Sequence, residues 1–495
     1  MARDPKRFGT VGTILSTLLI VLLIAAIALV VWMCIDLASA PADQPQMEAP
    51  VSLPGVQQEV ETTAAPTTQA TEPPTTAPPP EPEHVVSTAS ISIQGDLLMH
   101  EPVFRTCNTG NGYDFSSIFL YMKEYTDRFD FSGANLETTF GGDNYKYQGN
   151  PEFNCPDGLE LAVKDVGYDM LLTANNHASD TRADGIKRTV EKVRDAGLLA
   201  LGTQLSDEEP KFGVQEINGI KVGMICYTYA TGTSDDGLRP RLNGLAPVGE
   251  VGLVNFFREN NLDDFYTEVV GHLAAMKEAG AEATMIFLHW GVEYQTKEND
   301  KQDAMTQKLC DLGFDVVVGG HPHVVQPVET KTSTLDPSHN TVVIYSLVNA
   351  VSNQRSGYST LFPPGYTEDG AMFSVVFEKY SDGTVYLADV DVLPTWVNMR
   401  TDTNPKQYNI VPLEDSRRGE WADAFGLNNN TQSQAERSYE RTMGIVGEGL
   451  EQAKALLTQL KTDRDQNYYN IANGLAEAPA ETPAPVTEET VASAA

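Results

Sequence analysis

The segment FDVVVGGHPHVVQ, residues 314–326, decides the fold. Its apolar, β-branched run ends in two glycines, and His321 and His323 follow at once. A short apolar run that ends at a turn signal is typical of a buried strand. The segment ATMIFLHWGVEY, residues 283–294, repeats this arrangement, with His289 directly after the apolar run. Both segments therefore predict a buried strand that carries polar side chains at its carboxyl end.

Apolar runs of this kind alternate along the chain with longer amphipathic segments. The alternation predicts an α/β domain with a largely parallel or mixed central sheet. The predicted strands are residues 89–94, 169–173, 221–227, 283–288, 314–318 and 341–346. We also expect helices at 185–196 and 264–279, a hairpin formed by 372–378 and 384–390, and one or two helices within 433–460.

The N-terminal region contains an almost wholly aliphatic run at residues 11–35, preceded by basic residues. A helix of roughly 20 apolar residues crosses a bilayer core of ~30 Å, so the run predicts one transmembrane helix. Basic residues before the run predict a cytoplasmic N-terminus and an extracellular main domain in the cell membrane. A cleaved signal peptide is the alternative, because residues 38–40 resemble a cleavage site. The length of the run and the proline at position 41 favour an uncleaved anchor.

Composition divides the rest of the chain. Segments rich in Pro, Thr, Ala and Glu bury too little apolar surface to offset their ordering entropy, which predicts disorder. We therefore expect a cytoplasmic tail at 1–10, the transmembrane helix at 11–35, a Pro/Thr-rich disordered linker at 36–86, a folded domain at 87–398, a C-terminal helical extension at 399–470 and a disordered tail at 471–495.

The formal net charge of −34 restricts the partners of the protein. It argues against nucleic acid, which requires a basic surface. An anionic substrate would have to be held locally, by metal ions or by a few basic residues. Arg182, Lys187 and Arg188 are candidates, although a solvated helix face is the favoured interpretation.

The chain has five cysteines, and none of them forms a CxxC pair. A thiolate zinc site is therefore not expected. Cys107 and Cys155 lie in loop-like sequence, where a disulfide and two unpaired thiols are equally open interpretations.

Side chains that can bind metal follow several of the predicted strands. They are Asp96, Asn135, Glu137, Asn175, Asn176, His177, His289, His321 and His323. Ligands bind an open α/β sheet at the carboxyl ends of its strands, so these residues should converge. Carboxylates and neutral imidazoles suit Mn²⁺, Mg²⁺, Zn²⁺ or Fe²⁺. The ligands exceed the needs of one ion, which predicts two divalent ions ~3.5–4 Å apart that share a carboxylate and activate a water.

Each of these residues also has a structural explanation when it is taken alone. A single histidine after a strand is more often a hydrogen-bonded structural residue. Asn175 and Asn176 suit a helix N-cap, and Gly95 with Asp96 forms a turn signal. The recurrence of such residues at separate strand ends favours the metal site.

Taken in chain order, GDLLMH, NLET, ANNHASD, FLHWGVEY, GGHPHVVQ and YSLVN resemble the motifs of the CapA family of capsule-synthesis proteins. The resemblance covers about residues 87–396. It implies a fold of the calcineurin-like metallophosphatase superfamily, with layered sheets flanked by helices. It also implies a membrane-anchored protein that acts on poly-γ-glutamate or a related anionic envelope polymer, together with capsule-synthesis membrane proteins.

The resemblance implies a role for each residue. Asp96 and His323 would bind the first ion, Glu137 would bridge, and Asn176, His289 and His321 would bind the second ion. His177 would be catalytic, by protonating a leaving oxygen or stabilising charge. The expected substrate-binding residues are Asn135, Asn175, Trp290, Glu293 and Asn349. For Trp290 and Glu293, packing of the following helix is an equal alternative.

The chain departs from related patterns at two kinds of position. Leucines follow Asp96 where true phosphatases have D-x-H, and residues 135–137 replace their G-D-x-x-D motif, as in the CapA family. Residues 181–182 and 348–350 depart from the pattern of the CapA family itself. Val348 stands where that family has glycine, which we expect to narrow or reshape the loop near the site.

Three functions fit these features. The first is synthesis or processing of an anionic capsule polymer, and the second is a metal-dependent phosphoesterase acting on an envelope substrate. The third is a non-catalytic scaffold of the same fold. The number of candidate ligands favours a metal-dependent hydrolase over a scaffold.

Overall fold

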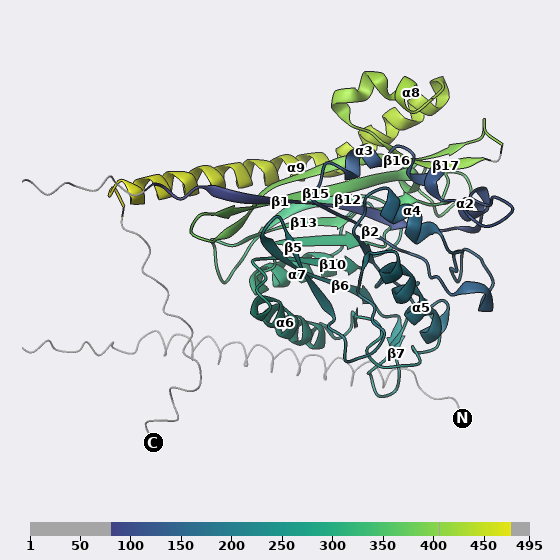
Figure 1. Cartoon of the computed structure of the whole chain (residues 1–495), viewed down its shortest axis with the longest axis horizontal. Helices are drawn as coiled ribbons and strands as arrows, with labels where there is room; N and C mark the ends of the chain where they lie inside the picture. Colours follow the sequence, from purple (N-terminus) through teal and green to yellow (C-terminus); the bar gives the residue numbers. More distant parts are fainter. Residues whose placement is uncertain (1–80, 405, 477–495) are drawn as a thin grey trace, which may run out of the picture. The chain divides into compact units, whose positions relative to one another are not determined.

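The computed structural model describes residues 81–404 and 406–476 (Figure 1). Within these residues, no helix is long and apolar enough to cross a membrane. The predicted transmembrane helix at 11–35 and most of the predicted linker lie outside the described residues, as does most of the predicted C-terminal tail.

The first of two large sheets is eight-stranded and mixed. Its order is β17-β16-β15-β1-β2-β3-β4, and β14 also pairs with β1. The strands are β1 (Val85–Leu97), β2 (Phe131–Asn135), β3 (Met170–Leu172), β4 (Leu199–Leu201), β14 (Asn349–Val351), β15 (Asp369–Tyr380), β16 (Val385–Arg400) and β17 (Gln407–Pro412). Strands β14, β1, β2, β3 and β4 run parallel, and β15, β16 and β17 continue the sheet in antiparallel pairs.

The second sheet is seven-stranded, with the order β12-β13-β11-β10-β6-β5 and with β9 paired to β6. Its strands are β5 (Phe212–Ile217), β6 (Ile220–Tyr229), β9 (Phe256–Phe257), β10 (Ala283–His289), β11 (Val316–Gly320), β12 (Gln326–Thr332) and β13 (Asn340–Ser346). Its four central strands, β13, β11, β10 and β6, are parallel. A separate short hairpin pairs β7 (Gly232–Thr233) with β8 (Pro240–Arg241).

The two sheets pack face to face, and strand alternation explains why. In β10, Met285 and Phe287 share a buried core with Ile91 and Met170 of the first sheet. The alternate residues of β10, such as Ile286, lie in a different core on the outer face. Side chains alternate across a strand, so a strand that is apolar at every position can bury both of its faces. The alternation of segments predicted these strands correctly but placed them in one central sheet, whereas the structure has two. Two sheets flanked by helices agree with the layered sheets that the family resemblance implies.

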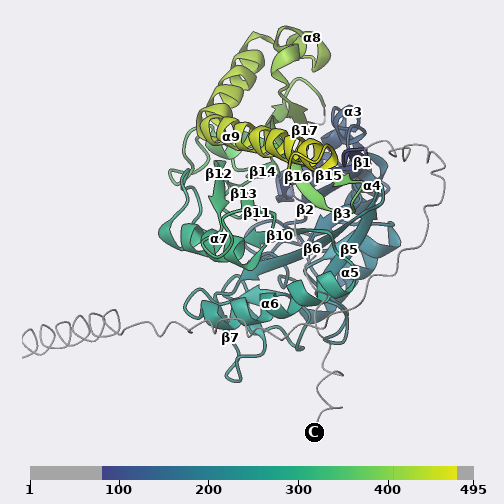
Figure 2. The ribbon, with the colours of Figure 1, turned by 90° about the vertical axis from the view of Figure 1, so that its left-hand side faces the viewer.

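Helices cover the outer face of each sheet (Figure 2). On the first sheet these are α2 (Glu101–Thr106), α3 (Lys123–Thr126), α4 (Leu159–Asp165) and α5 (Arg182–Asp195), and on the second α6 (Leu262–Glu278) and α7 (Asp300–Leu312). Short 3₁₀ turns lie at η1 (Ser116–Phe119), η2 (Gly142–Asn144), η3 (Tyr366–Glu368) and η4 (Asp415–Glu420). The result is a four-layer α/β fold, in which the predicted helices correspond to α5 and α6.

One side of the two-sheet core is closed by α9 (Asn429–Ala472), which follows the short α8 (Trp421–Ala424) and packs on β16 and β12 (Figure 1). Gly449 permits this contact, because a Cβ at that position would lie 1.8 Å from the Val328 carbonyl oxygen. The segment 399–470 differs from the helical extension expected there, since it begins with β17. Tyr408 and Ile410 of β17 are buried in the outer core of the first sheet, and this burial accounts for the strand.

Candidate metal centre

The candidate ligands lie where the parallel strands of both sheets end. Asp96 lies near the end of β1, and Glu137 follows β2 by two residues. His289 is the last residue of β10, and His321 follows β11 directly. Side chains from two different sheets therefore meet: His289 Nε2 lies 3.5 Å from Glu137 Oε1.

Two groups of side chains have metal-binding geometry and share one carboxylate. In the first group, one ligand atom each of Asp96, Glu137 and His323 lie within 4.8 Å of one another. In the second group, Glu137, His289 and His321 satisfy the same criterion. A third group joins His321 and His323 to the exposed Glu293. Glu137 therefore occupies the position from which one carboxylate can serve two ions.

Four of the candidate ligand atoms lack hydrogen-bond partners. Within the described part of the chain, Asp96 Oδ2, both carboxylate oxygens of Glu137 and His321 Nδ1 are buried without a hydrogen bond. An unsatisfied buried polar atom costs about 1–3 kcal/mol, and more if it is charged, so most proteins avoid it. Several such atoms facing one point are explained by divalent ions, for which carboxylate and imidazole are suitable donors. The residues present therefore fit a divalent metal.

Neighbouring amides hold the ligands in position. Asn135 Nδ2 donates to Asp96 Oδ1 at 2.7 Å, and His323 Nδ1 lies 3.1 Å from Asn349 Oδ1. His289 Nε2 lies 2.8 Å from Asn176 Oδ1, so these two ligand atoms are close enough to bind one ion. Hydrogen bonds of this kind fix the orientation of metal ligands and the tautomer of histidines.

The electrostatics of the group favour a cation. Burial lowers the pKa of His289 to about 3 and that of His321 well below its usual value, which keeps both imidazoles in the neutral form that binds metal. Burial and the charge of Asp96 raise the pKa of Glu137. Burial acts to raise the pKa of Asp96 as well, but hydrogen bonding and charge from His323 and His289 outweigh it and lower the pKa. A bound cation would relieve the repulsion between the two carboxylates.

His177 has its own support beside the ligands. Its Nδ1 lies 2.7 Å from Asp180 Oδ2, and Asp180 also accepts a 2.6 Å hydrogen bond from the Phe153 amide and a 3.2 Å bond from Asn243 Nδ2. Asp180 therefore places the proton on Nδ1 and leaves Nε2 to act on a substrate. The sequence analysis did not single out Asp180, although it lies three residues after His177 in the ANNHASD motif.

The predicted substrate residues fall into two classes. Asn135, Asn175 and Asn349 are buried and hydrogen-bond within the scaffold; for example, Asn175 Nδ2 donates to the Leu136 carbonyl oxygen at 2.8 Å. Trp290 is 1% exposed and donates to the Tyr345 carbonyl oxygen at 3.0 Å, so it occupies a packing position rather than a groove wall. Glu293 is exposed and lines a groove.

That groove has a volume of about 890 Å³ and reaches the metal ligands at His321. Its wall is formed by β7 and the residues just before it, the residues after β9 and the segment that contains Glu293. Tyr229 lies between the groove and the ligands, with its ring 4.9 Å from that of His321. Burial raises the pKa of Tyr229, so its hydroxyl remains a neutral donor. Sequence reasoning missed Tyr229, which is the last residue of β6, two residues beyond the predicted strand 221–227. Its position at a strand end was the signal that could have identified it.

Backbone strain is concentrated at the same place. Tyr294, His321, His323 and Val348 all have positive φ, with values of 66°, 99°, 54° and 60°. This conformation is uncommon for residues other than glycine and is an outlier for a β-branched residue. Val348 thus keeps a turn that glycine would adopt without strain, and its carbonyl oxygen accepts a 2.8 Å hydrogen bond from the Asp96 amide.

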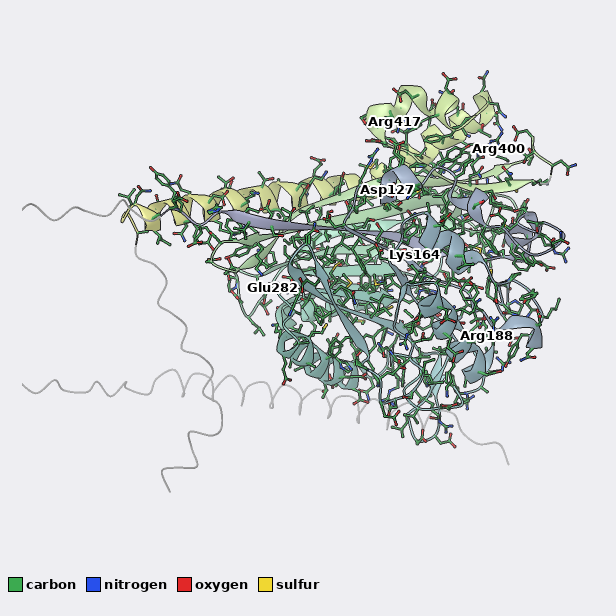
Figure 3. The ribbon with its side chains drawn as sticks, in the orientation of Figure 1. Asp127, Lys164, Arg188, Glu282, Arg400 and Arg417 are labelled. Atoms are coloured by element: carbon green, nitrogen blue, oxygen red, sulfur yellow. The ribbon has the colours of Figure 1, made fainter. Side chains whose placement is uncertain are left out.

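The basic residues of α5 are engaged with carboxylates. Arg188, which projects from α5 in Figure 3, pairs with Asp157 at 2.7 Å. Arg182 pairs with Glu152 and Lys187 with Glu250. These contacts fit the interpretation of a solvated helix face. Cys107 and Cys155 are both buried as free thiols in the structure.

The fold and the site together define an α/β protein of two packed sheets, with a candidate metal-ligand cluster at the carboxyl ends of strands from both sheets. The family described as "Bacterial capsule synthesis protein PGA_cap" matches residues 90–354, more than half of the chain, and the chain belongs to that family. The resemblance to CapA proteins is thereby confirmed. All the candidate metal ligands lie within the matched residues, and α9 lies outside them.

Individual proteins are similar at lower levels. The chain is 27% identical over 310 residues to the "PGA biosynthesis protein CapA" of Bacillus subtilis (strain 168), covering 61% of this chain and 71% of that protein. It is 26% identical over 310 residues to the "Capsule biosynthesis protein CapA" of Bacillus anthracis, covering 62% and 66%. A solved structure, "Termus thermophilus Sulfate thiohydrolase SoxB in complex with glycerol", matches 72% of this chain and 60% of that chain at 12% identity, with a TM-score of 0.34.

Proposed function

We propose that the protein acts in the synthesis or processing of an anionic capsule polymer, poly-γ-glutamate or a related envelope polymer, through a two-metal site. The observation that carries this proposal is the set of buried ligand atoms of Asp96, Glu137 and His321 without hydrogen-bond partners. Membership in the capsule-synthesis family supplies the substrate class. The printed names of the similar proteins support the same class.

Two ions, rather than one, account for the shared position of Glu137. Asp96 and His323 would hold the first ion, Asn176, His289 and His321 the second, and Glu137 both. Glu293 is a further candidate, because it groups with His321 and His323. The donor set suits Mn²⁺, Mg²⁺, Zn²⁺ or Fe²⁺.

The chemistry divides between the ions and the side chains around them. Bound divalent ions would polarise the scissile bond and lower the pKa of a bound water. His177, whose Nδ1 lies 2.7 Å from Asp180 Oδ2, can protonate a leaving oxygen from Nε2 when the imidazole is doubly protonated, and it then returns to the neutral form with the proton on Nδ1. Tyr229 presents a neutral hydroxyl from the groove wall to an oxygen of the substrate.

A metal-dependent phosphoesterase is the second candidate, because the same donor set suits in-line attack at phosphorus. A scaffold without turnover is less compatible with the cluster, since buried carboxylates without partners destabilise a fold that has no use for them. We place the site outside the cell, tethered by the aliphatic run at 11–35, where polymer and capsule-synthesis membrane proteins would meet it.

The test uses the full-length protein in detergent or in membranes. Metal content is measured by mass spectrometry, and hydrolysis is assayed on a γ-glutamyl polymer and on phosphate esters. We expect about two equivalents of metal, and a loss of turnover of about 10²–10⁴-fold in His177→Ala with the metal retained. His272→Ala, which changes a histidine on α6, is the matched control.

Two outcomes would contradict the proposal. One is a protein purified under metal-replete conditions that binds no divalent ion. The other is a His177→Ala variant with the same turnover as the His272→Ala control. Turnover of phosphate esters without action on γ-glutamyl polymer would favour the second candidate.

A further inference from the structure

A second cavity, of about 530 Å³, lies away from the candidate ligands, between the loop after β14, the end of β16 and the start of α9. Arginine side chains from two of these elements surround it: Arg355 from the loop, and Arg437 and Arg441 from α9. The net charge of the chain is −34, so the electrostatic field of the whole protein is negative. The three guanidinium groups make this cavity a place where an anionic ligand can still bind.

Two of these arginines are fixed in place by buried acids. Arg355 is 8% exposed and pairs with Glu368 at 2.7 Å. Arg441 donates from Nε and Nη2 to both carboxylate oxygens of Asp369, and Nη2 also donates to the Gly365 carbonyl oxygen at 3.1 Å. Arg355 also donates from Nη1 to a main-chain carbonyl oxygen. Since a guanidinium has five N–H donors, Arg441 keeps the two donors of Nη1 for a ligand, and Arg355 keeps the donor of Nε.

The third arginine carries the excess charge. Arg437 is exposed, and within residues 81–404 and 406–476 it forms no ion pair. It lies on one face of α9 with Asn430, Gln434 and Arg441, because residues three and four apart are neighbours on a helix. All four of these side chains line the cavity.

The part of the cavity wall formed by β16 contains a buried amide oxygen without a hydrogen-bond partner. Asn398 of β16 lines the cavity and is 2% exposed. Within the described part of the chain, its Oδ1 is buried and accepts no hydrogen bond. Such a group is costly unless a ligand or an ordered water satisfies it. The cavity thus combines guanidinium donors with an amide side chain that lacks a partner.

This combination matches a polymer with alternating carboxylate and amide groups. Guanidinium binds carboxylate through paired hydrogen bonds with matched geometry. The Asn398 side chain can pair with a backbone-like amide, which both donates and accepts. A polyphosphate or a sulfated polymer would use the arginines but would leave Asn398 unsatisfied.

The cavity shares a loop with the metal centre. Gln354 Oε1 accepts a 3.1 Å hydrogen bond from Asn349, the residue whose Oδ1 lies 3.1 Å from His323. Arg355 is the next residue after Gln354, and adjacent Cα atoms are ~3.8 Å apart. One short segment therefore supports a metal ligand at one position and lines the cavity at the next.

We propose that this cavity is a binding subsite for a carboxylate-rich amide polymer, of the γ-glutamyl type, that holds a segment of the chain beside the metal centre. Arg437 and Arg441 bind carboxylates of the polymer, and Asn398 pairs with an amide between them. The proposal rests on the proposed function, because it names how the same substrate class is held outside the metal centre.

The test measures binding of a fluorescently labelled γ-glutamyl oligomer to the full-length protein by anisotropy. Arg437→Glu is the main variant, because an exposed side chain can be changed without disturbing the fold. We expect the dissociation constant to rise about tenfold or more, which corresponds to ~1.4 kcal/mol, and a smaller rise in Arg437→Ala. Lys454→Ala removes the positive charge of a half-buried lysine that pairs with Asp391 farther along α9; it is the control for Arg437→Ala and should bind as the wild type does.

A second variant tests the amide wall. Asn398→Leu removes the buried atom without a partner, so it should preserve or raise the melting temperature while it weakens oligomer binding. Unchanged binding in both Arg437→Glu and Asn398→Leu would overturn the subsite. Equal competition by inorganic polyphosphate and by unlabelled γ-glutamyl oligomer would also overturn it, since it would indicate a non-specific polyanion site.

The result also separates this proposal from the proposed function. If His321→Ala abolishes oligomer binding and Arg437→Glu does not change it, the metal centre alone holds the polymer and the subsite is wrong. If Arg437→Glu weakens binding and His321→Ala does not, the subsite stands by itself. If the oligomer does not bind the wild-type protein, the polymer assignment fails for both.

Discussion

The two sheets contribute different chemistry to one site. The first sheet provides the carboxylates of Asp96 and Glu137, and the second provides the imidazoles of His289 and His321. The negative charges of the first sheet repel each other, which raises the pKa of Glu137. The imidazole of His321 in the second sheet is kept neutral by burial, because burial lowers its pKa. The difference shows that the candidate centre is formed only where the carboxyl ends of strands from both sheets come together. Its geometry therefore depends on the hydrophobic core that packs the two sheets against each other.

The largest effect on metal binding is expected at Glu137, which the two ligand groups of the site share. Glu137→Gln should remove the carboxylate common to both groups and weaken binding of both ions by more than ~100-fold, beyond the effect typical of a supporting residue. The metal-free variant should melt at a higher temperature than the metal-free wild type, because it no longer buries a carboxylate with a raised pKa. Metal analysis and melting curves with and without a chelator check both effects. Retention of two ions in this variant would remove the basis for a shared carboxylate.

A smaller effect is expected when one half of the site is altered. Asp96→Asn should lose the ion held with His323, and His321→Ala should lose the ion held with His289, so each variant should keep one equivalent. Metal titration followed by calorimetry measures the stoichiometry. Loss of both ions in both variants would indicate that the two groups form a single cooperative site.

The support behind His177 should affect turnover more than metal content. Asp180→Asn leaves one acceptor oxygen and no negative charge where three donors now meet a carboxylate, so the proton on Nδ1 is held less firmly and we expect turnover to fall by about 10–100-fold, as for other orienting residues. Metal content should stay at the wild-type level. The comparison requires kcat and bound metal on the same samples, and a parallel loss of both would assign Asp180 to the integrity of the site.

The smallest effect is expected for the stability of the fold, when Val348 in the loop between β13 and β14 is changed. Val348→Gly should lower stability by only about 1–2 kcal/mol, because relief of the left-handed conformation of a β-branched residue, about 1–2 kcal/mol, offsets part of the loss of a side chain that is 0% exposed in the core. Gly95→Ala should lower stability more, since its Cβ would lie 1.9 Å from the Val348 carbonyl oxygen. Chemical denaturation measures both variants. A Val348→Gly variant that is more stable than the wild type would show that the backbone strain outweighs the packing of the valine side chain.

Much of the fold could be predicted from local pattern. Apolar runs of strand length, such as residues 283–288, became β10, and the amphipathic segment at 264–279 became α6. The order in which polar residues follow such runs identified the candidate ligands for the same reason. A ligand at a strand end is a local feature of the sequence, because the strand and its first loop residues are adjacent in the chain.

The pairing of the two sheets was not available from that pattern. Met285 and Ile286 are equally apolar, yet one faces the other sheet and the other faces the helices. The residues that support the ligands were missed for a related reason. Tyr229 ends β6 and Asn243 lies in a loop, while the contacts that give them a role come from segments far away in the sequence.

The sequence by itself determined the elements of this protein, the candidate ligands at their ends and the family to which the chain belongs. Only the tertiary structure decided that the carboxylates and the imidazoles come from different sheets, that Trp290 packs while Glu293 faces a groove, and that arginines from a loop and from α9 surround one cavity. The physical reason is that local propensity and hydrophobic period act between neighbours in the chain. Convergence of side chains depends on burial between segments that only folding brings together.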